Sequence, residues 1–182
     1  MLVPYVNTNS GCQNLAPFIP YVAYEMNSVP KFVDALKTCI KSKDMSLAKD
    51  VYALLCKHGL ETNEDIANHL VPMLIECGSL HDAQAVFDRI SHPNAHSWTY
   101  LIAGYVQHGE SSYALDLYSK MHAGHIQPNS HTFAALIKGC SSLENMQNGE
   151  VIYLEVVKKG FEQDMYVNGA LVTMYVKRGL FP

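Results

Sequence analysis

The sequence predicts an all-α protein, a right-handed α-solenoid built from helix-turn-helix repeats. From Pro30 onward, apolar residues recur at the spacing i, i+3, i+4, i+7 of one helix face, and the alternating pattern of strands is missing. The chain also resembles itself: residues 29–78 set against 130–179 agree at 12 of 50 positions without a gap, for example at Phe32 and Phe133. Because one helical hairpin cannot bury its own apolar face, repeated hairpins are expected to stack.

Residues 1–28 differ in composition from the rest and predict a flexible leader. They hold Pro4, Pro17 and Pro20 but no Lys or Arg. Targeting peptides of mitochondria and plastids are amphipathic and rich in Arg. This segment by itself therefore supports import into an organelle only weakly.

The 101-residue period predicts hairpins of 35, 31 and 35 residues. Each is expected to hold a first helix, a turn with Gly or polar residues, and a second helix. In the third hairpin, Trp98, Leu101 and Ile102 share one face of the first helix, and Leu117 and Tyr118 share a face of the second. The predicted units are 29–63, 64–94, 95–129 and 130–164, followed by a partial unit at 165–182 that stops after its first helix and is interpreted as truncated.

Composition excludes several classes of protein. The chain has 182 residues, of which 48% are hydrophobic, so it can bury a core and is not expected to be disordered. No apolar run approaches the roughly 20 residues of a membrane helix, and no membrane partner is predicted. The net charge of −4 disfavours a strongly basic, nonspecific binder of nucleic acids.

The five cysteines do not predict a disulfide framework. Their number is odd, and no CxxC pair is present. Four of them fall inside apolar helical patterns and are expected to be buried and unreactive, namely Cys39, Cys56, Cys77 and Cys140.

Four runs of sequence resemble the pentatricopeptide repeat (PPR) family, and in particular its plant subclass with alternating P, L and S units. The run NAHSWTYLIAGYVQHGESSYALDLYSKMHAGHIQPN at 94–129 resembles a P unit, and NEDIANHLVPMLIECGSLHDAQAVFDRISHPN at 63–94 resembles an S unit. The run TFAALIKGCSSLENMQNGEVIYLEVVKKGFEQD at 132–164 and its partner at 32–63 resemble L units. The resemblance thus assigns L type to 29–63 and 130–164, S type to 64–94 and the partial unit at 165–182, and P type to 95–129.

The resemblance implies binding of single-stranded RNA, one base per repeat, through the fifth and last residues of each unit. In this sequence those pairs are Val33 with Asn63, Asn68 with Asn94, Thr99 with Asn129, and Ala134 with Asp164. Asn68 with Asn94 resembles a pyrimidine-reading pair that prefers cytosine, and Thr99 with Asn129 resembles an adenine-reading pair. Val33 and Ala134 cannot hydrogen-bond a base edge, so the implied RNA pattern is 5′-N-Y-A-N-3′.

The family also stacks bases on the second residue of each unit. His96, His131 and Tyr166 occupy these places and can stack, whereas Asp65 departs from the pattern. A different role is open for the last residues of the units. Helix N-caps need a side-chain acceptor, and this need alone would explain Asn94, Asn129 and Asp164.

No enzyme, cofactor or metal site is predicted. The triplet His108-Gly109-Glu110 fits the H-x-E of zinc deaminases, but no CxxC follows it. The expected function is therefore sequence-dependent RNA binding, as a specificity module for C-to-U editing or processing in a mitochondrion or chloroplast, with editing-complex proteins as further partners. The alternatives are an α-solenoid scaffold for protein-protein interaction and a non-functional truncated remnant.

Overall fold

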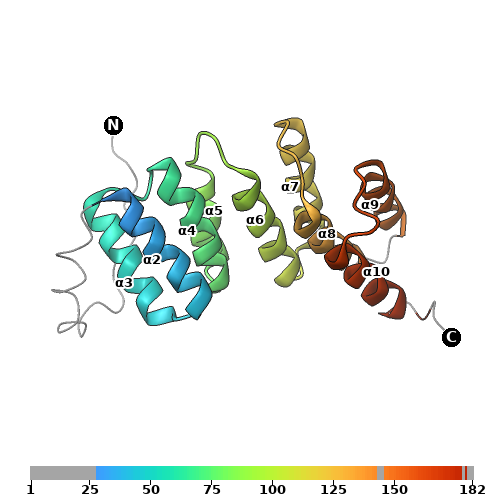
Figure 1. Cartoon of the computed structure of the whole chain (residues 1–182), viewed down its shortest axis with the longest axis horizontal. Coiled ribbons are helices and arrows are strands. Elements are labelled where there is room, and N and C mark those ends of the chain that lie inside the picture. The colour runs from blue at the N-terminus through green and yellow to red at the C-terminus, as the bar shows by residue number, and fades with distance from the viewer. Residues whose placement is uncertain (1–27, 143–145, 178, 180–182) are drawn as a thin grey trace.

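The computed structural model describes residues 28–142, 146–177 and 179, and within them the chain forms nine α-helices and no strands. The predicted leader thus lies outside the described residues except for Ser28. The helices follow one another along the long axis of the molecule (Figure 1). Their bounds are α2 Val29–Ser42, α3 Met45–His58, α4 Glu64–Glu76, α5 Leu80–Phe87, α6 Ala95–Gln107, α7 Ser111–Ala123, α8 Ser130–Ser142, α9 Met146–Lys158 and α10 Met165–Lys177.

The helices form two layers that run the length of the molecule. Helices α2, α4, α6, α8 and α10 form an inner row in which each contacts the next. Helices α3, α5, α7 and α9 pack on the preceding helix of that row, and α3, α5 and α7 also contact the following one. This is a helical solenoid, as the sequence predicts, and it places the first helix of every hairpin along one continuous face.

The apolar faces of the central helices are buried between neighbouring hairpins. Leu101 and Ile102 of α6 and Met121 of α7 are fully buried, and so is Phe133 of α8. Apolar area removed from water stabilises a fold by about 25 cal/mol per Å². The hairpins therefore stabilise one another, and each interface adds to the core of its neighbours.

Glycine closes the turns of the second and third hairpins, whereas Lys43 adopts the left-handed conformation after α2. Gly78 follows α4 with φ of 73°, and Gly109 follows α6 with φ of 82°. Side chains with a Cβ rarely adopt this left-handed conformation, which ends a helix without steric cost only for glycine. The turns thus bring α5 and α7 back onto the helices that precede them.

The prediction of four buried cysteines is correct for two of them. Cys39 and Cys140 are buried, with 3% and 0% of their surface exposed. Cys56 is exposed because it directly follows Leu55, which points into the core, and one residue turns a helix face by about 100°. Cys77 is half-buried because it lies after the last turn of α4, where its Sγ donates to Met73 Sδ.

A search of the described helices found none with the length and apolar character needed to span a membrane.

Candidate nucleic-acid interface

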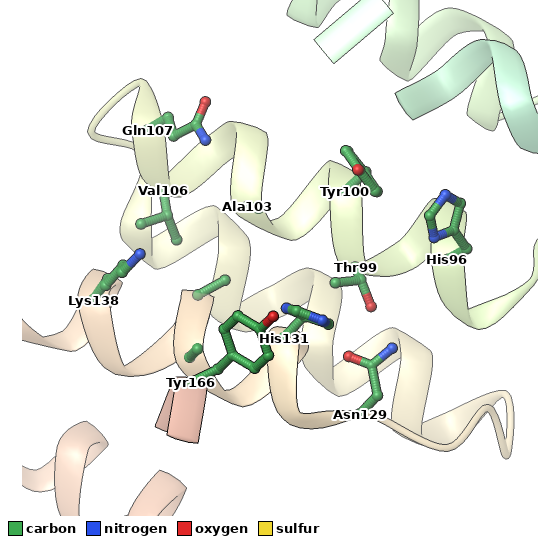
Figure 2. Close-up of a pocket in the computed structure, with 12 residues that line it drawn as sticks. His96, Thr99, Tyr100, Ala103, Val106, Gln107, Asn129, His131, Lys138 and Tyr166 are labelled. Atoms are coloured by element: carbon green, nitrogen blue, oxygen red, sulfur yellow. The ribbon is translucent and has the colours of Figure 1, made fainter. Parts of the chain in front are cut away.

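A pocket lies on the inner row between α6 and α8, with α10 at its edge (Figure 2). The structure brings Thr99 and Asn129, one of the predicted pairs, together with all three predicted stacking residues and with Ala134 of the next pair. The polar or aromatic side chains that line it include His96, Thr99, Asn129, His131, Lys138 and Tyr166. The other predicted residues are not part of the lining: Val33, Asn63, Asn68 and Asn94 lie before α6, and Asp164 follows α9.

Thr99 and Asn129 are linked through the hydroxyl of Thr132. Thr99 Oγ1 donates to the carbonyl oxygen of Ala95 at 2.7 Å and lies 2.7 Å from Thr132 Oγ1. Thr132 Oγ1 lies 3.1 Å from Asn129 Oδ1, to which it can donate, and accepts from the backbone N–H of Asn129 at 3.2 Å. The pair is thus held in place by a buried hydroxyl that does not line the pocket.

Asn68 and Asn94 are held by a matching set of bonds. The side-chain nitrogen of Asn68 donates to the carbonyl oxygen of Glu64 at 2.9 Å. Its Oδ1 accepts from the backbone N–H of Asn94 at 3.0 Å and from the hydroxyl of Ser97 at 2.6 Å. The fifth residue of one hairpin therefore contacts the last residue of the same hairpin and the third residue of the next first helix.

The last residue of each hairpin also caps the helix that follows. Asn63, Asn94 and Asn129 accept a backbone N–H through Oδ1 at 3.3, 3.0 and 3.0 Å, and Asp164 accepts two. The capping interpretation is therefore correct, and it also applies to Asn63. A cap occupies only the amide oxygen, so the amide hydrogens of Asn94 and Asn129 stay available as donors. Asp164 has no such donor.

The fifth residues of the two outer pairs are apolar and add no polar group. Ala134 is 9% exposed and lines the same pocket as Thr99, while Val33 packs against the core. Each is an alkyl side chain of the inner row, so a base beside it would meet a surface without a donor or acceptor.

Two of the predicted stacking rings already contact each other. The rings of His131 and Tyr166 are 4.3 Å apart between centroids and are tilted by 50°. A base entering between them would have to separate them first. His96 instead contacts Tyr100 of its own helix at 4.7 Å, and no ring contact joins it to His131 among the contacts described here.

The surroundings of His96, an exposed residue at the pocket, favour its neutral form. Burial lowers the pKa of His96 below 6.5, and the nearby His69 and His131 lower it further. An uncharged imidazole is a flat π surface suited to stacking.

Three residues at the interface were not found from the sequence. They are Ser97 and Thr132, whose hydroxyls join the pairs, and Lys138, which lines the pocket. A hydroxyl residue at the third place of two successive first helices is a signal that the sequence contains.

Comparisons with known proteins agree with this architecture. Family models match twice, one described as "PPR repeat family" at residues 93–142 and one described as "PPR repeat" at 131–161. A pentatricopeptide repeat-containing protein of Arabidopsis thaliana is 35% identical over 148 residues, which are 81% of this chain and 20% of the relative. A chloroplastic relative from the same plant is 35% identical over 150 residues, 81% of this chain and 28% of the relative. A mitochondrial one is 30% identical over 149 residues, 82% of this chain and 14% of the relative.

Solved structures show the same fold. The pentatricopeptide repeat protein PPR10 in complex with an 18-nt psaJ RNA element matches with a TM-score of 0.67 at 22% identity, over 81% of this chain and 22% of that one. PPR10 from maize matches with a TM-score of 0.65 at 22% identity, over 84% of this chain and 22% of that one.

Stacked helical hairpins with a polar inner row define a helical repeat protein. The chain belongs to the pentatricopeptide repeat family. It spans 14% to 28% of the length of the three curated relatives described above. Membership of this family of repeat proteins agrees with the expectation that the chain is not an enzyme.

Proposed function

We propose that the chain binds single-stranded RNA in a sequence-dependent way, with one base at each hairpin. The observation that carries the proposal is the shared pocket of Thr99, Asn129, His96 and His131. A base needs polar groups for its edge and flat groups for its faces, and this pocket offers both within one hairpin step.

The polar groups of the pocket suit adenine. Its Watson–Crick edge carries the N1 acceptor and the N6 amino donor. The Thr99 hydroxyl donates its proton to the carbonyl oxygen of Ala95 and can accept from the base, and the Asn129 amide hydrogens can donate. Asn68 with Asn94 forms the preceding site, for which we propose a pyrimidine.

Stacking supplies binding energy without selecting a base. Base stacking on an aromatic side chain contributes about 1–3 kcal/mol. His96 and His131 occupy corresponding places on α6 and α8, and Tyr166 occupies that place on α10. At the last step the contact of His131 with Tyr166 opposes entry of a base, which matches an expected lack of selectivity beside Ala134.

The phosphate backbone needs positive charge at the inner row. Lys138 lines the pocket, and Lys37 occupies the same place on α2, one 101-residue period earlier. Both side chains are exposed. The hairpins whose fifth residue is apolar thus carry a lysine, so they favour the backbone of RNA rather than its bases.

Relatives suggest the setting in which this binding occurs. Among them are chloroplastic and mitochondrial proteins, and PPR10 was solved with an RNA element. We therefore propose an organellar role in RNA modification, such as C-to-U editing, or in processing. Because two selective bases cannot specify one transcript, the chain would act with editing-complex proteins or as part of a longer array. The assignment of its hairpins to P, L and S types is part of this proposal.

The test is a change of base preference. The double substitution Thr99→Asn with Asn129→Asp should move preference at one position of a short RNA from adenine toward uracil, by about tenfold. Binding to RNAs that differ at that base is measured by fluorescence anisotropy. The control, Ser112→Asn with Gln127→Glu, adds the same charge at exposed positions in and after α7 and should leave the preference unchanged.

A folded double variant with unchanged preference would contradict the assignment of this pair. A folded chain that binds no RNA would contradict the proposed function and favour a protein-interaction scaffold.

A further inference from the structure

We infer that Ser97 and Thr132 are positioning residues for base selection, an inference that rests on the proposed RNA binding. Each is the third residue of a first helix, Ser97 on α6 and Thr132 on α8. Both are fully buried, so neither touches RNA from the surface. They act through the side chains that their hydroxyls contact.

The hydroxyl of Ser97 lies between the two members of the preceding pair. Its Oγ is 2.6 Å from Asn68 Oδ1 and 3.2 Å from Asn94 Oδ1. A hydroxyl carries one proton, and the shorter distance favours donation to Asn68. Together with the backbone N–H of Asn94, this bond gives Asn68 Oδ1 two donors.

This arrangement fixes which group Asn68 can offer to a base. Its oxygen is committed to Asn94 and Ser97, and one amide hydrogen is committed to Glu64. A flipped amide would place its nitrogen against the N–H of Asn94, two donors facing each other. Asn68 therefore offers its second amide hydrogen, and a donor selects cytosine, whose N3 accepts, over uracil, whose N3 carries a hydrogen.

The hydroxyl of Thr132 does the same for the following pair. It lies 2.7 Å from Thr99 Oγ1 and 3.1 Å from Asn129 Oδ1. When Thr132 donates to Thr99, the proton of Thr99 goes to the carbonyl of Ala95. A lone pair of Thr99 is then left to accept the N6 amino group of adenine.

In the described helices, a hydroxyl at the third place of a first helix occurs only where the preceding fifth residue is polar. At the third place of α4 stands Ile66, and at that of α10 stands Val167, both fully buried. The fifth residues that precede them are Val33 and Ala134, which have no polar group to orient. Among the four described junctions, a buried hydroxyl thus accompanies each polar fifth residue.

The experiment crosses two variants with two bases. RNA binding is measured with short RNAs that vary separately at the pyrimidine and adenine positions. Ser97→Ala should lower cytosine-over-uracil discrimination about fivefold, the effect of one hydrogen bond, and leave adenine preference intact. Thr132→Val, which keeps the shape, should lower adenine preference and leave cytosine preference intact. The control Ser97→Thr keeps the hydroxyl and should retain both preferences.

The outcomes separate this inference from the proposed function. Unchanged discrimination in both variants, with thermal melts showing intact folds, would overturn the inference alone. An equal loss at both bases in each variant would also overturn it, because it would indicate general loosening of the solenoid. An unaltered folded chain without affinity for RNA would overturn the proposed function and the inference with it.

Discussion

Asn129 can serve both of the roles that the sequence presented as alternatives. Its amide oxygen caps α8, and its amide hydrogens remain free to bind a ligand. Capping thus orients the amide instead of competing with base recognition. The same holds for Asn94 at α6. A residue can therefore contribute to helix stability and, under the proposed function, to base selection.

The cysteines provide a prediction at the scale of single residues. Burial raises the pKa of the Cys39 thiol to about 11, with smaller effects from Cys77 and Asp44. Burial raises the pKa of Cys56 as well, but that side chain is exposed. Alkylation of the native chain at pH 8, followed by mass spectrometry, should modify Cys56 well before Cys39 and Cys140. Equal labelling of all three without denaturant would contradict the packing of α2 and α8.

His96 predicts a pH dependence of stability. Its pKa lies below 6.5 in the folded chain, so the unfolded chain takes up the proton first as the pH falls. The contribution of His96 to the free energy of unfolding is complete above about pH 7. It decreases as the pH falls through 6.5 and levels off below the pKa of His96 in the folded chain. Thermal melts between pH 8 and pH 5 should show a smaller decrease in Tm for His96→Gln than for the unaltered chain. Parallel curves for the two chains would contradict this account of His96.

The pocket could be predicted from the sequence only in part. The spacing of the repeats and the family resemblance suffice to bring Thr99, Asn129, His96 and His131 to one hairpin step. The hydrogen bonds of Ser97 and Thr132 could not be derived, because they depend on how far one helix is displaced along its neighbour. The contact of His131 with Tyr166 depends on side-chain rotamers, which a pattern of residues does not contain.

At the scale of elements, α8 positions one side of the pocket and is packed on four neighbouring helices. It packs on α6, α7, α9 and α10. Phe133 lies in its first turn, with ring centroids 5.5 Å from Phe161 and 6.1 Å from Tyr118. The positions of Asn129 and His131 therefore depend on the apolar packing of Phe133.

Phe133→Ala should lower the free energy of unfolding by about 3–5 kcal/mol, because it removes a fully buried ring and leaves a cavity. Urea denaturation followed by circular dichroism measures the change. The control Leu154→Ala alters a side chain that is 66% exposed on α9, and it should stay within about 0.5 kcal/mol of the unaltered chain. A similar loss in both variants would contradict the two-layer packing.

The helices were predictable because each has an apolar face that recurs with helical spacing. The ends of the helices were less predictable. The apolar pattern extends to Ile90, but α5 ends at Phe87, and Ile90 is buried although it lies in the turn that follows. A buried residue just beyond a helix continues the pattern without continuing the helix. The division into L, S and P units remains a prediction, because helices alone do not distinguish the types.

At the scale of the whole molecule, the net charge of −4 limits how RNA can be held. A net negative charge disfavours a general basic surface, so single lysines on the inner row should carry the salt dependence. Lys138 is the cation that lines the pocket.

Lys138→Gln should weaken binding about equally for all RNA sequences and reduce the slope of log affinity against log salt by about 0.7. Lys138→Arg should preserve both quantities. The control Lys158→Gln removes the same charge from α9, where that lysine contacts Glu155, and should leave the slope unchanged. An unaltered slope in Lys138→Gln would remove this residue from the RNA-binding surface.

The spacing of the inner row tests the central claim most directly. Binding should be measured for the unaltered chain with two RNAs, one in which cytosine and adenine are adjacent and one in which a single extra nucleotide separates them. If successive hairpins meet successive bases, the spacer should weaken binding about tenfold, since only one of the two pairs can then engage its base. Equal affinity for both RNAs would contradict a register of one nucleotide per hairpin.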